Sequence, residues 1–270
     1  MTTATSALRT PRRLVSLARA EWIQFRRNKV ILFMSAFVLL VIPVLFFRSI
    51  SGAESAADSR ALASTALQML VLMAIVFVVY YSVLSMATTR RDEGVLTRLR
   101  TGEASDREIL LAICTPSSLF AILASVLGGV LCVALGSALP INVFFYLVAI
   151  LGGVVLAAAL ALITSAYTSN AEAAQVTSMP VIVLGMLSIP TLRGFLPDPL
   201  ALIAARNPFG ALLDLVHLGW TGQSDPLNSE AATMNLAETF SSGGMTVLIL
   251  MAWCVALVLL VPRVMRWDNR

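Results

Sequence analysis

The sequence predicts an all-α integral membrane protein with six transmembrane helices. Its 270 residues are 58% hydrophobic and only 13% charged, whereas average soluble domains are about 45–50% apolar and about 25% charged. The mean hydropathy is +0.87, and long stretches carry no charge. These stretches are apolar on every face, whereas the strands of a transmembrane barrel alternate apolar and polar residues. The composition therefore excludes a soluble enzyme, a disordered chain and a disulfide scaffold, and it favours membrane helices.

A membrane-spanning helix needs about 20 mostly apolar residues, and six stretches approach or exceed that length. The fourth follows Asn142, which fits a helix N-cap, and the fifth is short and bracketed by Pro180 and Pro190. We divide the chain into an N-terminal segment (1–28), a six-span domain (29–262) and a tail (263–270). The six expected spans cover residues 30–47, 65–88, 109–136, 143–167, 173–189 and 245–261.

The basic residues are concentrated in the segments that join the spans on one side. With the N-terminus inside, the inner segments 1–29, 89–108, 168–172 and 262–270 hold 15 of the 19 basic residues. Cytoplasmic loops carry such an excess of Lys and Arg, so we expect both termini in the cytoplasm. The same rule accounts for the net charge of +4, which in a soluble protein would suggest nucleic-acid binding. Because 18 of the 19 basic residues are Arg and Ala is abundant, we expect a bacterial inner-membrane protein.

The segment before the first span predicts an amphipathic helix. Trp22 and Phe25 lie on its apolar face together with Glu21, whereas Arg19 and Arg26 lie on the other face. Such a helix lies in the inner interface of the membrane, with Trp at headgroup depth and Arg toward anionic lipid. The alternative is an ordinary basic tail that flanks the first span. A signal peptide is disfavoured, because the basic region is too long and no small-residue cleavage site follows the apolar run.

The outer segment between the fifth and sixth spans contains two short apolar runs. They are Leu200–Ala205 and a second run that ends at Trp220. Between them, Asn207 and Pro208 are typical of an N-cap followed by a first-turn proline. Each run is too short to cross a bilayer, so we expect a re-entrant or interfacial pair of short helices covered by protein. Residues 221–241 are then expected to form a polar exposed loop.

The sequence lacks the motifs of a nucleotide hydrolase and of a serine hydrolase. A Walker A loop needs Gly-Lys followed by Ser or Thr, yet the only lysine, Lys29, is followed by Val30. His217 is the only histidine, which excludes a zinc site with two histidines, and no Gly-x-Ser-x-Gly is present. We expect His217 to form a local polar pair with Asp214 at a wet surface. A contact with a proton or a substrate is the alternative.

The central parts of the expected spans contain no acidic or basic side chain. Ion-driven carriers place ionisable groups or broken helices near the middle of the membrane, so a stand-alone secondary carrier or channel is the disfavoured alternative. The energy for transport should then come from another polypeptide. The three cysteines have no metal-ligand spacing and are expected to be small buried hydrophobic residues: Cys114, Cys132 and Cys254.

The most informative stretch is the connector between the second and third spans, on the inner side. Asp92 and Glu93 open it, and Val95, Leu96 and Leu99 recur at helical spacing. A short helix with two acidic residues in its first turn is stabilised by the helix dipole. Its leucines fit a groove on a partner, with the neighbouring arginines pairing around the rim. The alternative is a solvated turn between two spans.

Several motifs, in this order, resemble those of ABC-2 type exporter permeases. Glu21 and Arg26-Arg27-Asn28, followed by an apolar run with Pro43, resemble the opening of these proteins. The run Arg91-Asp92-Glu93-Gly94-Val95-Leu96 resembles the motif after their second span, usually Arg-Glu-x-Gly-Thr-Leu followed by Thr-Pro. This chain departs from it with Val95 in place of Thr and with Thr101-Gly102 in place of Thr-Pro. Leu196–Leu200 and Arg206–Phe209 resemble the outer re-entrant segment of the family.

The resemblance implies the permease subunit of an ATP-driven exporter, which dimerises with a second copy or a paralogue. A separate cytoplasmic ABC ATPase would hold ATP and Mg, so that this chain binds no cofactor or metal and is not itself an enzyme. An amphipathic, drug-like or lipid-like substrate, as in multidrug efflux, would move outward through the dimer interface between spans two and five. The connector would be the coupling helix and the N-terminal helix an elbow helix. The residues implied are Arg91, Asp92, Glu93, Gly94, Val95, Leu96 and Leu99 for coupling, Glu21, Trp22 and Arg26 for the elbow, and Gln68, Met69, Phe77, Tyr81, Met186 and Leu187 for the substrate pathway.

Overall fold

The computed structural model describes residues 23, 55–101, 105–170, 172–228, 232–265 and 267. Across these residues the regular secondary structure is helical, with no strand. The first expected span, residues 30–47, lies outside the described residues. So does the expected elbow helix, apart from Ile23, which is helical and exposed.

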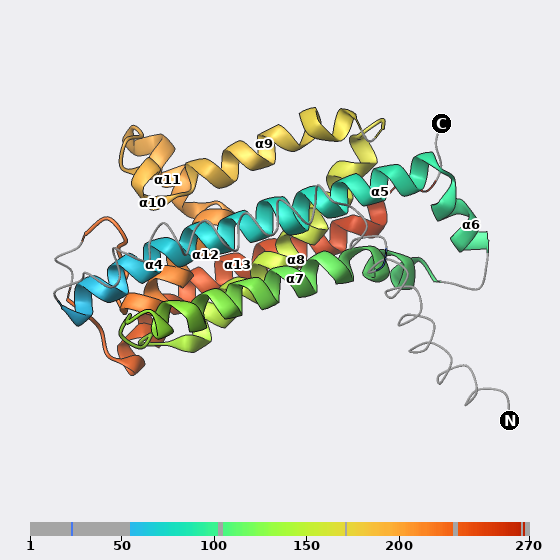
Figure 1. The fold of residues 1–270 in the computed structure, drawn as a ribbon. Helices are drawn as coiled ribbons and strands as arrows, with labels where there is room; N and C mark the ends of the chain where they lie inside the picture. The colour runs from blue at the N-terminus through green and yellow to red at the C-terminus, as the bar shows by residue number, and fades with distance from the viewer. Residues whose placement is uncertain are drawn as a thin grey trace, which may run out of the picture.

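The centre of the fold is a straight rod made of three consecutive helices (Figure 1). It consists of α4 (Ala56–Met73), the π-helix η1 (Ala74–Tyr81) and α5 (Ser82–Asp92), and its span candidate, Ala57–Asp92, is 36 residues long. The expected second span, 65–88, falls inside it. The most apolar window of the rod is 72% buried, against 22% for the last helix of the chain, which places the rod in the interior and the last helix at the periphery.

Three further long helices complete the bundle, of which the first two pack against the rod and the third packs on the second and on α12 (Pro208–Thr221). They are α7 (Asp106–Ala134), α8 (Val143–Tyr167) and α13 (Leu236–Val264). The bounds of α8 match the expected fourth span, because the Asn142 side chain accepts a hydrogen bond from the Phe144 amide and caps the helix. The third and sixth expected spans, 109–136 and 245–261, lie almost wholly within α7 and α13.

The beginning of α13 corrects one expectation. Residues 221–241 were expected to form a loop throughout, but the helix begins at Leu236. Asn235 and Glu238 form a capping box, in which each side chain bonds the backbone N–H of the other residue. This arrangement satisfies orphan donors of the first turn, so a polar first turn can precede the apolar part of the helix.

The three shorter helices that follow α8 in the chain lie on the opposite side of the rod from α7, whereas α12 passes behind the rod (Figure 1). The fifth expected span corresponds to α9 (Ala173–Leu187), which at 15 residues is shorter than a standard span. It is followed by α10 (Pro190–Arg193), α11 (Asp198–Arg206) and α12 (Pro208–Thr221), and the last two helices are bent by 77°. The described residues thus include four helices that can cross a membrane, or five if the bent pair counts as one. Six spans remain a prediction.

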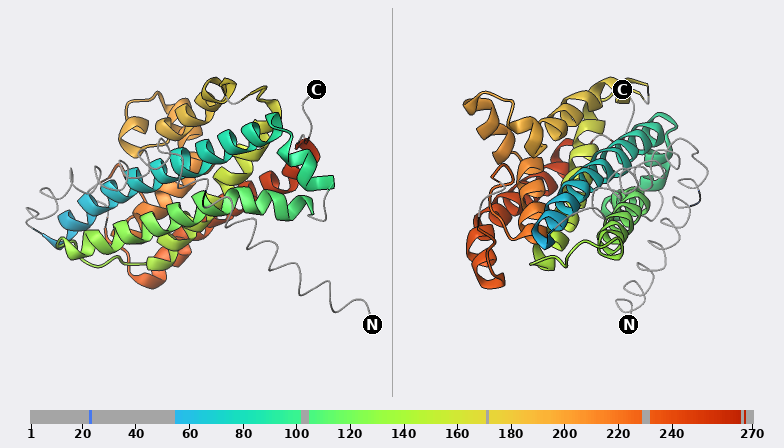
Figure 2. Two further views of the ribbon diagram at one scale, coloured as in Figure 1. Left: turned by 45° about the vertical axis from the view of Figure 1, so that its right-hand side comes forward. Right: turned by 60° about the vertical axis from the view of Figure 1, so that its left-hand side comes forward.

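The sharp bend between α11 and α12 confirms the expected pair of short helices. The Asn207 side chain accepts hydrogen bonds from the amides of Phe209 and Gly210, and Pro208 occupies the first turn. The second helix lies deeper than expected, because every residue of α12 from Pro208 to Thr221 is buried except Asp214, which is half-buried. Figure 2 shows α10 and α11 clustered at one end of the molecule, far from α6 (Val95–Thr101).

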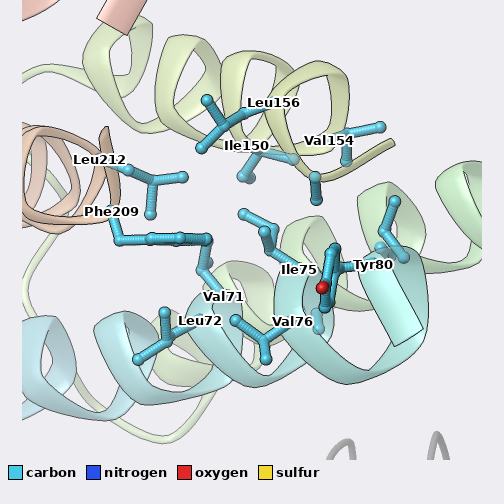
Figure 3. Close-up of a cluster of buried hydrophobic side chains, with 14 of the residues drawn as sticks. Val71, Leu72, Ile75, Val76, Tyr80, Ile150, Val154, Leu156, Phe209 and Leu212 are labelled. Carbon is cyan, nitrogen blue, oxygen red and sulfur yellow. The ribbon is translucent and has the colours of Figure 1, made fainter. Parts of the chain in front are cut away.

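The hydrophobic core lies where the rod meets α8 and α12. Figure 3 shows side chains from these three elements pointing toward one another. Close packing of this kind, rather than intrinsic helix propensity, provides most of the stability of helices in a folded protein. The core side chains labelled there are Val71, Leu72, Ile75, Val76 and Tyr80 of the rod, Ile150, Val154 and Leu156 of α8, and Phe209 and Leu212 of α12.

Candidate functional site

The connector between α5 and α7 is a tight corner followed by the short helix α6. The α5 helix ends at Asp92, and Glu93 caps it with its amide bonded to the Thr89 carbonyl at 2.9 Å. Gly94 then adopts φ of +66°, a left-handed conformation that L side chains rarely adopt. Glycine at this position therefore allows α6 to leave at an angle to the rod.

The apolar side of α6 is turned toward the protein itself. Leu96 is 0% exposed, and Leu99 packs half-buried against the same core. The expectation that the leucines dock in a groove on a partner is therefore wrong for Leu96, because its side chain already covers the ends of neighbouring helices of this chain.

Arg91 is also directed inward, not toward a rim. It is 5% exposed; its Nη1 donates to the Ser165 carbonyl at 2.7 Å and its Nη2 donates to the Thr168 carbonyl. These carbonyls belong to the C-terminal end of α8, where helix carbonyls lack intrahelical partners. Arg91 thus fastens the C-terminal end of the rod to the end of α8.

Further contacts fix α6 to the rest of the bundle. The Arg100 side chain pairs with Asp106 of α7 at 3.1 Å and lies 5.1 Å from the ring centre of Trp267. The Thr97 hydroxyl donates to the Trp267 carbonyl at 3.0 Å. The corner residues Asp92 and Glu93 stay exposed, so the connector presents two carboxylates on a base that is tied to α7, to α8 and to the segment after α13.

Most of the expected pathway residues of the rod share one face. The half-buried positions of α4, η1 and the start of α5 recur at every fourth residue, whereas the positions between them are almost all buried. The wider turns of the π-helix η1 form the second half of this stripe. We call these half-buried residues the pathway stripe: Thr65, Met69, Met73, Phe77 and Tyr81.

Gln68 does not belong to the stripe. It is 6% exposed, and its amide nitrogen donates to the Leu213 carbonyl of α12 at 3.2 Å. Met186 and Leu187 end α9 and are half-buried and 38% exposed, respectively. The structure therefore separates Gln68 from the other expected pathway residues. Glu21, Trp22 and Arg26 of the expected elbow lie outside the described residues.

A polar network that the sequence did not predict holds α12 to its neighbours. Asp214 forms an ion pair with Arg193 of α10, and the Nδ1 of His217 lies 3.1 Å from the Ser64 hydroxyl of α4. The expected surface pair of Asp214 and His217 is thus wrong: His217 is 8% exposed, and each residue has a partner on another element. No local spacing indicates these partners, which lie 21 and 153 residues away in sequence.

The fold and the connector define a class of protein: a helical membrane protein with a buried central rod, a bent helix pair at one end and, at the other end, a corner with two exposed acidic residues that leads into a short helix. The family of ABC-2 type transporters matches residues 12–216, which cover most of the chain and include the connector and the bend between α11 and α12. The chain belongs to this family and is the membrane component of an ABC transporter. Comparison with curated proteins gives no match.

Proposed function

We propose that the chain is the permease subunit of an ATP-driven exporter, which moves an amphipathic, drug-like or lipid-like substrate outward through a dimer interface. A separate cytoplasmic ATPase subunit, which holds ATP and Mg, supplies the energy. The observation that carries the proposal is the exposed pair Asp92 and Glu93 on a connector that is fastened to α7, to α8 and to the segment after α13, in a chain of this family. The resemblance in sequence gives this connector the role of a coupling helix.

The contacts of the connector support a rigid transfer of movement. A push on the corner is passed to the rod directly, to α8 through Arg91 and to α7 through Arg100 and Asp106. Helices that are tied at one end move as a body, which is the usual way in which an effector movement reaches a distant site. In this mechanism Arg91 is a positioning residue, and Asp92 and Glu93 contact the ATPase.

The pathway stripe suits an amphipathic substrate. It combines Met, Phe and Tyr side chains with one Thr, along a rod that lies beside α9 (Figure 1). Methionine side chains adapt to ligands of irregular shape, and aromatic and apolar side chains predominate in sites for small molecules. We propose that this stripe, with Met186 and Leu187, faces the stripe of a second subunit across the pathway. Gln68 serves a different purpose, because its amide is bonded to α12.

The distribution of charge supports a cytoplasmic position for the connector. Basic residues in the described part of the chain are more numerous at the α6 end than at the α10 end, as expected for inner segments. Six arginines lie at the α6 end (Arg90, Arg91, Arg98, Arg100, Arg107 and Arg263) and three lie elsewhere (Arg60, Arg193 and Arg206).

The test is capture of the ATPase from the native host through a tagged chain. The wild type should bring down a protein with ATPase activity, and Asp92→Lys with Glu93→Lys should lose it while still inserting in the membrane. The matched control replaces Asp198 and Asp225, which are exposed at the other end of the molecule, with Lys and should retain the ATPase. If neither capture nor crosslinking in membranes finds an ATPase, or if the connector variant retains it, the proposed coupling is wrong.

A further inference from the structure

A small pocket lies at the α10 end of the molecule, away from the connector. It has a volume of about 100 Å³ and is walled by α4, α12, the turn between α9 and α10, and the segment after α12. Met69, Ile189 and Pro190 form part of its apolar wall. The polar side chains that line it are Thr65, Gln68, Thr191, His217, Gln223 and Asn228.

The imidazole of His217 has one nitrogen that no protein group satisfies. Its Nδ1 is bonded to Ser64, whereas its Nε2 is buried and has no hydrogen-bond partner among the described residues. Buried polar atoms are almost always hydrogen-bonded, and leaving one unsatisfied costs about 1–3 kcal/mol. The pocket beside this ring is the space from which a partner can come.

The contact with Ser64 fixes which nitrogen carries the proton. The Ser64 hydroxyl makes no other hydrogen bond within the described part of the chain, so its hydrogen is satisfied only by donation to Nδ1. A neutral imidazole that accepts at Nδ1 carries its proton on Nε2. The unsatisfied Nε2 of His217 is therefore a hydrogen-bond donor, and an oxygen acceptor in the pocket would satisfy it.

Gln68 supplies the complementary group. Its amide nitrogen is used by the Leu213 carbonyl, and its amide oxygen accepts no hydrogen bond from the residues that the structure describes. None of the described residues that line the pocket carries a formal charge, and the nearby Arg193 is already paired with Asp214. Burying an unpaired charge here would be costly, so the pocket favours an uncharged group.

We propose that this pocket binds the uncharged, hydroxyl- or carbonyl-bearing head of an amphipathic molecule. The Nε2–H of His217 donates to an oxygen of the head, Gln68 accepts from a hydroxyl, and Met69 and Ile189 contact the apolar part that follows. The head can belong to a membrane-borne molecule or to a dissolved polyol. This site is distinct from the pathway stripe except at Thr65 and Met69, and its occupancy does not depend on an ATPase.

The single histidine makes the site directly observable. The full chain, purified through a tag without histidine and placed in lipid nanodiscs, is labelled with ¹⁵N in the histidine ring, which gives one pair of nitrogen resonances. At about pH 8, where ordinary histidines with a pKa of about 6.5 are neutral, we expect the Nε2–H tautomer. Titration with 1-monooleoylglycerol should shift the Nε2 resonance saturably. Oleate and oleylamine, which have the same chain length and charged heads, should bind at least about tenfold more weakly, or 1.4 kcal/mol.

The arms of the experiment separate the two sources of the head. A shift with glycerol at concentrations comparable to those of monooleoylglycerol indicates a dissolved ligand, and a shift with monooleoylglycerol alone indicates a membrane-borne one. Gln68→Leu should weaken binding about tenfold, whereas Gln175→Leu, the same change at an exposed position of α9, should leave it unchanged. If Gln68→Leu does not fold, Ser64→Ala carries the test, because it removes the group that selects the tautomer and should both mix the tautomers and weaken binding.

Three results would overturn the proposal. The first is an Nδ1–H tautomer in the wild type. The second is the absence of a saturable shift with either uncharged probe, as expected for a pocket that holds only water. The third is binding of oleate as tight as that of monooleoylglycerol. None of them bears on the capture of an ATPase, and a failed capture would leave the binding result intact, so the two proposals fail independently.

Discussion

Single polar side chains in this protein join elements that are distant in sequence. Arg193 and Asp214 link α10 to α12, and their side chains are only 6% and 23% exposed. Removing one partner of a buried ion pair leaves the other charge without compensation, and such changes cost about 3–5 kcal/mol. Arg193→Met should therefore destabilise the protein by about 3 kcal/mol, since Asp214 keeps some contact with solvent. The thermal unfolding midpoint in detergent measures this loss.

A double variant distinguishes the pair from its separate residues. In Arg193→Met with Asp214→Leu no charge remains uncompensated, so most of the stability should return. If instead the stability losses of the two single variants simply add in the double variant, the ion pair is not the cause of the destabilisation by Arg193→Met.

Gly210 is the residue at which the bend after α11 allows no side chain. A Cβ atom there would collide with the carbonyl oxygens of Ala204 and Ala205, which are backbone atoms and cannot turn aside. Gly210→Ala should lower stability by about 1–3 kcal/mol, the usual cost of overpacking. Gly244→Ala is the matched control, because a Cβ there meets nothing within 4 Å and Ala favours a helix. Equal unfolding midpoints for the two variants would show that the bend is not tight at Gly210.

At the scale of elements, the sequence predicts helix bounds and bends that depend on local composition. The bounds of α8 follow from one apolar run and a cap at Asn142, and the α11–α12 bend follows from Asn207 and Pro208. The burial of α12 does not follow, because an apolar run with Asp214 and His217 is equally typical of an interfacial helix. Its place in the core depends on partners that come from other elements.

The connector shows the same limit at the candidate site. Helical spacing correctly places Leu96 and Leu99 on one face, but it does not say whether a partner or the protein itself covers that face. Leu96 is 0% exposed, since α6 packs on the ends of its neighbours. The inward position of Arg91 could not be predicted from local sequence either, because the carbonyls that it binds lie 74 and 77 residues away in sequence.

The fastening of α5 to α8 gives a prediction about coupling. Each hydrogen bond of Arg91 involves a charged donor and contributes about 1.5–3 kcal/mol. Arg91→Met removes both hydrogen bonds and should therefore reduce the substrate-stimulated ATPase activity of the assembled complex several-fold. The ATPase should still copurify with this variant. Arg91→Lys, whose ammonium lacks the planar fork that reaches two carbonyls, should be intermediate.

Arg107→Met is the control, because Arg107 is exposed at the start of α7. Unchanged stimulation in Arg91→Met would assign this arginine a purely structural role at the end of α8, and loss of the ATPase from the complex would place it in the docking surface instead.

For the whole molecule, the topology depends on whether α9 crosses the membrane. Its 15 residues rise about 22 Å at 1.5 Å per residue, less than the roughly 30 Å of a bilayer core. If Thr101 lies on the cytoplasmic side, α7 crosses the membrane outward and α8 crosses it back, so α9 begins on the cytoplasmic side. The loop after α12 can then lie outside only if α9, together with the turn after it, crosses the membrane.

In a variant with Cys114, Cys132 and Cys254 replaced by Ala, Ser224→Cys should react with an impermeant thiol reagent in intact cells, and Thr101→Cys should react only after lysis. Both positions are exposed, so access is decided by the membrane alone. Labelling of Thr101→Cys but not Ser224→Cys would invert the topology, and protection of both until lysis would mean that α9 does not cross.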